Sequence, residues 1–238
     1  MNIQLAERIQ YAVAVIYPDI QQSAGVQRQA PTEATVWYEF SCCVLSSQVP
    51  FSLAQAAADK IDESGVLSCS DSRPRSDIEH DLSAILHGAF SIDGKLRRYR
   101  FPAAKSAQLA AAKSNIAGCF GSLTEALTHY SDVEDTRRWL VQHAPGLGPK
   151  QASMFLRNLG VSDEMAILDR HILSYMSLTG LRHESRTSIS NYKSYTSYET
   201  VLRDHANSLG YTLGLFDWAL WVVMRVLADI SLAEGQTA

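Results

Sequence analysis

The stretch from Trp139 to Tyr175 constrains the fold of this chain more than any other part of the sequence. A polar helical segment leads into a Pro/Gly turn at Ala144–Lys150, and a second short helix, a loop and a third helix beginning after Asp169 follow. Gly146 and Gly148 permit a tight turn with positive φ. The sequence therefore predicts a helix, a hairpin and a second helix, with a third helix close behind.

The rest of the chain also favours helices, because few stretches alternate apolar and polar residues over four or more positions. We expect an all-α protein with two lobes and a cleft: one lobe at about 25–130, the other at 131–238, and an N-terminal helix at 1–17 packed on the second lobe. The expected helices are 2–16, 52–61, 77–87, 103–116, 132–143, 151–159, 171–178, 198–208 and 215–232, with loops at 64–74 and 182–197.

Composition narrows the class of protein. With 238 residues, 46% hydrophobic and 19% charged, the chain can bury a core. The net charge of -4 weighs mildly against nucleic-acid binding. A local basic cluster is either a solvated loop or a basic face on an acidic protein; it comprises Lys95, Arg97, Arg98, Arg100 and Lys105.

Cysteine usage and hydropathy suggest where the protein works. The four cysteines include no Cys-x-x-Cys pair, which argues against zinc or iron–sulfur ligation and suits a reducing cytosol. Arg225 interrupts the longest apolar run, at about 219–228, so no membrane span is expected. The first ten residues lack a signal-peptide pattern.

The predicted hairpin places two chemically useful residues. Unpaired amides at the turn and at the following helix start suit a phosphate, and they grip DNA of any sequence. Lys150 lies at that helix start, where the helix dipole and burial against a cleft wall both disfavour an ammonium, so it is a candidate amine nucleophile. Asp169, 19 residues later, is a candidate N-cap whose carboxylate could face Lys150 and stabilise a sugar cation. Taken separately these are an ordinary turn lysine and a helix cap; their joint order and spacing favour chemistry.

These residues resemble a known family. PGLGPKQASMFLRN followed by AILDRHI is similar to the helix-hairpin-helix DNA glycosylases, and most similar to the type-two 8-oxoguanine DNA glycosylases of archaea and bacteria. YEFSCCVLSSQ, YRFPAAKSAQL and LGLFDWALWVV extend the resemblance over about 38–225. It implies two helical lobes around a DNA-binding cleft, a flipped-out nucleotide, and a bifunctional glycosylase/AP lyase that acts through a lysine Schiff base. It implies duplex DNA with a damaged base as partner, a monomer in the cytoplasm (associated with the nucleoid in a prokaryote), and no metal or other cofactor.

The resemblance also assigns roles to single residues. It implies Lys150 as nucleophile, Asp169 as catalytic carboxylate, Gly146 and Gly148 as the phosphate-binding hairpin, Gln48 as the residue that fills the gap in the duplex, and His171 near a phosphate. Met154, at i+4 from Lys150, is either a wall of the base pocket or a core residue. Phe216, Trp218 and Trp221 are candidate stacking partners. Trp218 is the preferred pocket residue, and Trp221 is assigned to the core.

Two alternatives stay open. The same chemistry could act on another oxidised or alkylated base, although the chain lacks the four-cysteine cluster of the endonuclease III-like branch, and Lys150 argues against monofunctional alkylbase enzymes. A non-catalytic DNA-binding protein could also use the hairpin alone.

Overall fold

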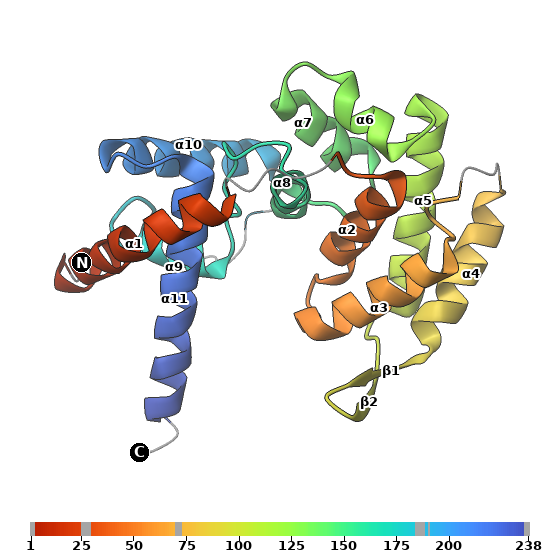
Figure 1. Ribbon diagram of the computed structural model, residues 1–238, viewed down its shortest axis with the longest axis horizontal. Helices are drawn as coiled ribbons and strands as arrows, with labels where there is room; N and C mark the ends of the chain where they lie inside the picture. The colour runs from red at the N-terminus through yellow and green to blue at the C-terminus, as the bar shows by residue number, and fades with distance from the viewer. Residues whose placement is uncertain (1–2, 25–29, 70–72, 184–188, 190, 236–238) are drawn as a thin grey trace. The chain divides into compact units, whose positions relative to one another are not determined.

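In the part of the chain that the structure describes, helices joined by loops make up the fold, together with one short β-hairpin (Figure 1). The computed structural model describes residues 3–24, 30–69, 73–183, 189 and 191–235. Within them lie eleven helices and one two-stranded sheet, which confirms the predicted fold class. The elements are α1 Ile3–Ala24, α2 Glu33–Leu45, α3 Phe51–Ser64, α4 Arg75–His87, β1 Ala89–Ile92, β2 Lys95–Arg98, α5 Pro102–Phe120, α6 Leu123–His129, α7 Val133–His143, α8 Pro149–Asn158, α9 Arg170–Leu178, α10 Tyr192–Ser208 and α11 Leu213–Gly235.

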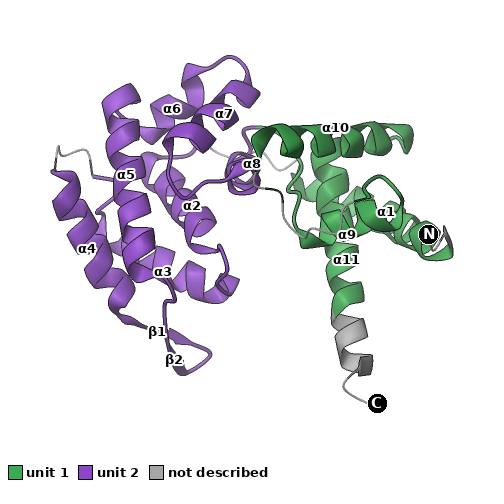
Figure 2. Ribbon diagram, turned by 180° about the vertical axis from the view of Figure 1, so that it is seen from behind, with its two compact units in different colours: residues 1–28, 162–238 green, residues 29–161 purple. Residues whose placement is uncertain are grey.

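The chain divides into two compact units (Figure 2). Unit 1 comprises Met1–Arg28 and Ser162–Ala238, and unit 2 comprises Gln29–Val161. The boundary predicted at about 130 differs from this division, which falls after Val161. Helices α7 and α8 pack against α2, α5 and α6, so the boundary falls after α8. In unit 1, α1 packs along α11.

Unit 1 is built around one apolar cluster. Ile9 and Val13 of α1, four residues apart and hence on one face, pack with Leu173 of α9 and Leu220 of α11. Gly214 at the start of α11 lies against the backbone of Asp163, since a Cβ there would stand 2.3 Å from the Asp163 carbonyl oxygen. This close approach ties the start of α11 to the loop that leads into α9.

Helix α2 is central to unit 2, and its side chains from Phe40 to Leu45 are all buried. The ring of Phe40 meets that of Phe155 on α8 edge-on, with centroids 5.6 Å apart. Asn158 Nδ2 donates to Glu39 Oε1 at 2.7 Å and ties the end of α8 to α2. The helix that carries Lys150 is thus held along its length by α2.

The β1–β2 hairpin was not predicted. Its strands have four residues each, and only Phe90 is buried, so they give almost no alternating pattern. The available signal was the turn: Asp93 and Gly94 have φ values of 50° and 73°, as the two central residues of a type I′ hairpin require. Ile92 pairs with Lys95 across this turn.

Helix α10 begins earlier than expected. The residues after Asn191 were predicted as loop, but Asn191 caps the helix by accepting from the Ser194 amide at 3.0 Å, and Tyr195 is fully buried. A buried tyrosine in a Ser/Tyr-rich stretch carries too little apolar periodicity to mark a helix. Residues 184–188 and 190 of the predicted loop lie outside the described residues.

Hydropathy identifies no single helix among the described residues that is long and apolar enough to cross a membrane; one bent pair, Tyr192–Ser208 with Leu213–Ala228 at 91°, would qualify jointly by length and composition alone.

Candidate active site

The predicted helix–hairpin–helix is formed by α7, the turn 144–148 and α8. Gly146 has a φ of +99°, and a Cβ there would lie 2.9 Å from Val44 Cγ1, so both its conformation and its surroundings require glycine. Gly148 differs from expectation: its φ of -85° and ψ of 178° are extended, and it is the N-cap of α8. The turn needs one left-handed glycine, not two.

The start of α8 leaves its amides available. Gly148 provides no side-chain cap, and Pro149 at the first helical position has no N–H. From α7, the buried Arg137 donates to Ser153 Oγ at 2.9 Å, and Ser153 donates to the Pro149 carbonyl at 3.0 Å. These bonds fix the two helices of the motif relative to each other and leave a helix N-terminus suited to an anion.

Lys150 follows directly and is half-buried. Its charge is felt by Cys43, which is fully buried in α2: burial and then Glu39 raise the pKa of the Cys43 thiol well above its usual value, and Lys150 opposes that rise. Met154 is half-buried on the Lys150 face, whereas Ala152 and its neighbours Ser153, Phe155 and Leu156 face the core. That placement agrees with the expected pocket wall and stays a prediction.

Gln48 lies in the turn between α2 and α3. It is exposed and has a φ of 60°, which is uncommon for a residue with a side chain. Its neighbour Ser47 accepts a hydrogen bond from Gln151 Nε2 at 3.0 Å, so this turn is tied to the first turn of α8. A non-glycine residue whose backbone is held at positive φ and whose side chain is exposed is a candidate functional position.

Asp169 in unit 1 is the N-cap of α9, as predicted. Its Oδ1 accepts from the amides of His171 at 2.8 Å and Ile172 at 3.1 Å, and its Oδ2 accepts from Trp221 Nε1 at 3.1 Å. Both oxygens are therefore fixed in direction. Trp221, which is predicted to lie in the core, is half-buried and packs against the apolar cluster of unit 1, and the Arg225 guanidinium lies over its ring at 5.1 Å.

Side chains from distant parts of the chain form hydrogen bonds with the backbone of residues 166–168, just before Asp169. Glu199 accepts from the Ala166 amide at 2.9 Å, and Asp217 accepts from the Ile167 amide at 3.2 Å. The Tyr195 hydroxyl accepts from the Leu168 amide at 3.1 Å and donates to the Ala166 carbonyl at 2.8 Å. The three side chains, Glu199, Asp217 and Tyr195, are at most 3% exposed. They hold an irregular segment rigid without regular secondary structure.

The other predicted site residues of unit 1 differ in how far they are buried. His171 is half-buried in the first turn of α9, and Arg170 Nε donates to its Nε2 at 3.3 Å. Trp218 is half-buried on α11. Phe216 is fully buried among the rings of Tyr175, His205 and Tyr211, and so offers no face to a base. Its assignment to the base pocket is wrong; the aromatic spacing marked a core residue.

The structure brings the predicted residues together in two sets. Unit 2 holds Gly146, Lys150, Met154 and Gln48, and unit 1 holds Asp169 with His171, Trp218 and Trp221. The pairing of Lys150 with Asp169 stays a prediction.

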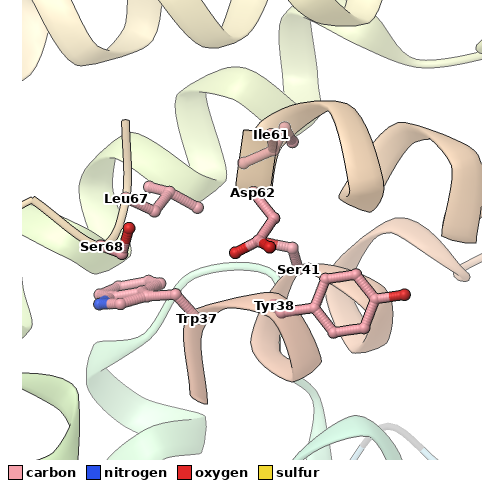
Figure 3. Close-up of a pocket in the computed structure, with 7 residues that line it drawn as sticks. All are labelled: Trp37, Tyr38, Ser41, Ile61, Asp62, Leu67 and Ser68. Atoms are coloured by element: carbon pink, nitrogen blue, oxygen red, sulfur yellow. The ribbon is translucent and has the colours of Figure 1, made fainter. Parts of the chain in front are cut away.

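A cavity in unit 2 has a volume of about 10 Å³ and is lined by side chains of α2, of α3 and of the turn after α3, among them Trp37, Ile61 and Leu67 (Figure 3). It holds at most a single water and excludes a nucleobase. Among the described residues, no three His, Cys, Asp or Glu side chains cluster as metal ligands.

A helix–hairpin–helix followed by a capping aspartate at the start of the next helix defines the class of helix-hairpin-helix DNA glycosylases. The family model for 8-oxoguanine DNA glycosylase matches residues 21–211, and the chain belongs to this family. A relative from Sulfurisphaera tokodaii named 8-oxoguanine DNA glycosylase/AP lyase is 32% identical over 189 residues, 78% of this chain and 80% of the relative.

Two solved structures share the fold. The 8-oxoguanine DNA glycosylase of Thermotoga maritima has a TM-score of 0.67 at 25% identity and covers 92% of this chain and 94% of its own. The Methanocaldococcus jannaschii 8-oxoguanine glycosylase/lyase, solved with a 15mer DNA that contains 8-oxoguanine, has a TM-score of 0.62 at 21% identity and covers 92% and 95%.

Proposed function

We propose that this protein removes 8-oxoguanine from duplex DNA and then nicks the strand, with Lys150 as nucleophile and Asp169 as the carboxylate that serves it. Its family membership and the name of the Sulfurisphaera relative support the reaction class and the base. The observation that carries the proposal is the Asp169 carboxylate, held by two amides and one indole at a helix start. Such fixed orientation suits stabilisation of developing positive charge.

The chemistry needs an unprotonated amine at Lys150. Its lone pair forms a bond to C1′ of the flipped-out nucleotide while the C1′–N9 bond breaks, and the base departs with the bonding electrons. The sugar resembles an oxocarbenium ion at the transition state, where the ionised Asp169 carboxylate stabilises its positive charge. Once the C1′–N bond has formed, the same carboxylate accepts the proton that the attached amine loses. Opening of the sugar ring gives a Schiff base, and loss of a C2′ proton expels the 3′ phosphate by β-elimination.

DNA binding follows from the same elements. The uncapped start of α8 offers amides to a backbone phosphate without reading the base. Gln48 enters the duplex to fill the space of the flipped nucleotide, and His171 lies near a phosphate. Met154 and Trp218 form walls of the base pocket.

Borohydride trapping on an 8-oxoguanine duplex tests the proposal. Wild type is expected to give a covalent complex that Lys150→Gln abolishes. Lys193→Gln is the matched control, because Lys193 occupies the same second position of its helix, α10, but is exposed. No complex with wild type, or undiminished trapping in Lys150→Gln, refutes the proposed nucleophile.

A panel of duplexes with different lesions, cleaved with and without alkali, tests the base. We expect 8-oxoguanine to be cleaved fastest, and strand nicking without alkali shows the lyase step. Trapping on another oxidised or alkylated base alone would keep the chemistry and overturn the substrate. DNA binding with no reaction on any lesion would establish a non-catalytic protein.

A further inference from the structure

Three arginines line an open groove on unit 2. Arg97 and Arg98 belong to β2 and Arg100 follows it, while the facing wall comprises Gln48, Val49, Pro50 and Leu53. The groove has a volume of about 370 Å³, and among the residues that the structure describes no acidic side chain lines it. The chain as a whole has a net charge of -4, whereas this groove gathers three positively charged side chains.

The three guanidinium groups can bind an external anion, and that of Arg100 lies over the Phe101 ring at 4.9 Å from its centroid, which leaves its N–H groups at the edge of the stack. Arg97, Arg98 and Arg100 are exposed, and within the described residues none of them pairs with a carboxylate. Lys95 of the same strand is exposed as well. The fifth member of the basic cluster seen in the sequence, Lys105, is buried in α5, and burial lowers its pKa. The exposed positive charges of this basic cluster therefore lie on strand β2 and on the residues that directly follow it.

The hairpin is anchored at the place where Gln48 emerges. Tyr99, between two of the arginines, is 4% exposed and donates its hydroxyl to the Leu45 carbonyl at the end of α2, at 2.6 Å. The next residues form the turn that carries Gln48, and Ser47 in that turn is bonded to Gln151 of α8. The arginine groove, Gln48 and the start of α8 are thus joined through the end of one helix.

We propose that the β1–β2 hairpin is a second binding site for the DNA backbone, in addition to the helix–hairpin–helix, whose arginines hold phosphates beside the point where Gln48 enters the duplex. This inference rests on the proposed function. Arginine suits phosphate because its planar fork donates two parallel hydrogen bonds. Because Gln48 shares the groove, the anion expected there is the backbone next to the lesion.

Two exposed apolar side chains flank the lining residues. Phe51 is 64% exposed and follows Pro50, and Leu96 is 78% exposed and precedes Arg97. Apolar side chains beside arginines are a common combination in proteins that contact bent or opened DNA, where they touch sugars and unstacked bases. An acidic protein segment would match the charge but would not account for a strained glutamine in the same groove.

The test compares two triple variants by their affinity for an 8-oxoguanine duplex at several salt concentrations. Arg97→Gln, Arg98→Gln and Arg100→Gln change the net charge from -4 to -7 (-4 - 3 = -7). The matched control changes Lys60, Arg75 and Lys193 to Gln, giving the same net charge from exposed sites off the groove. We expect the slope of log K against log salt to fall by about 2 to 3 in the hairpin variant only, at roughly 0.9 per phosphate contact.

Arginine-to-lysine changes at the same three positions should keep the slope, because lysine retains the positive charge. A retained slope shows that all three arginines can be replaced without disrupting the hairpin. Equal slopes for wild type and the Gln variant, or an equal loss in the control, would overturn the proposal. Trapping by wild type is measured in parallel. Absent trapping with an intact slope difference refutes the proposed chemistry alone, and normal trapping without a slope difference refutes the hairpin site alone.

Discussion

Trp221→Phe isolates the support that Asp169 receives from α11. The change keeps an aromatic ring and removes the indole N–H that donates to Asp169 Oδ2 at 3.1 Å, while the amide bonds to Oδ1 remain. A hydrogen bond to a charged group contributes about 1.5–3 kcal/mol. If all of it acts in the transition state, excision slows by roughly 10- to 160-fold, since 1.36 kcal/mol is tenfold in rate.

We expect a fall of about tenfold, near the lower limit, because two amide donors still orient the carboxylate. The assay is single-turnover excision from an 8-oxoguanine duplex, with alkali to reveal every abasic site. The matched control is Trp37→Phe, which removes an indole bond of 2.7 Å to Glu33 in unit 2. It should lower the melting temperature and leave the rate unchanged. A folded Trp221→Phe protein with wild-type excision would show that the indole does not position Asp169.

Three further predictions concern the framework. Gly146→Ala should destabilise the protein by about 1–3 kcal/mol and weaken DNA binding, whereas Gly118→Ala, with no atom within 4 Å of its Cβ, should stabilise it by up to about 1 kcal/mol; denaturant unfolding compares them. Tyr195→Phe leaves the Leu168 amide and the Ala166 carbonyl without the hydroxyl and should cost about 1–3 kcal/mol while lowering excision more than binding, which unfolding and kinetics together measure. Burial lowers the pKa of His205 in the folded protein below its unfolded value of 6.5. The folded state is therefore most stable above pH 6.5, where His205 is neutral in both states, and it loses stability as the pH falls from 6.5 towards the folded pKa. His205→Gln should flatten this part of a plot of melting temperature against pH.

Much of the active region could be predicted from the sequence because local rules fix it. The Pro/Gly turn, the lysine at a helix start and the aspartate cap each follow from backbone requirements, and the structure forms the turn with Gly146, α8 and the Asp169 cap at those positions. Gly148 was assigned the wrong conformation because a glycine permits positive φ without requiring it.

The missed features depend on contacts between distant residues. Phe216 and Trp221 are both aromatic residues of one helix, and only packing decides that the first is enclosed by rings while the second reaches Asp169. The supporting roles of Glu199 and Asp217 leave no local signal, because their partners lie 33 and 50 residues away in the chain. The β1–β2 hairpin did leave one, the Asp93–Gly94 turn.

The hydrogen bonds by which distant side chains hold the backbone of Ala166, Ile167 and Leu168 have an evolutionary consequence. Glu199 and Asp217 grip backbone amides, and those are chemically the same whichever residue carries them. Substitutions in the segment itself are therefore constrained only by packing, whereas the residues that grip it have few replacements. Purifying selection for the geometry of Asp169 should fall most heavily on α10 and α11, and those helices, more than the segment beside Asp169, should record the history of this candidate site.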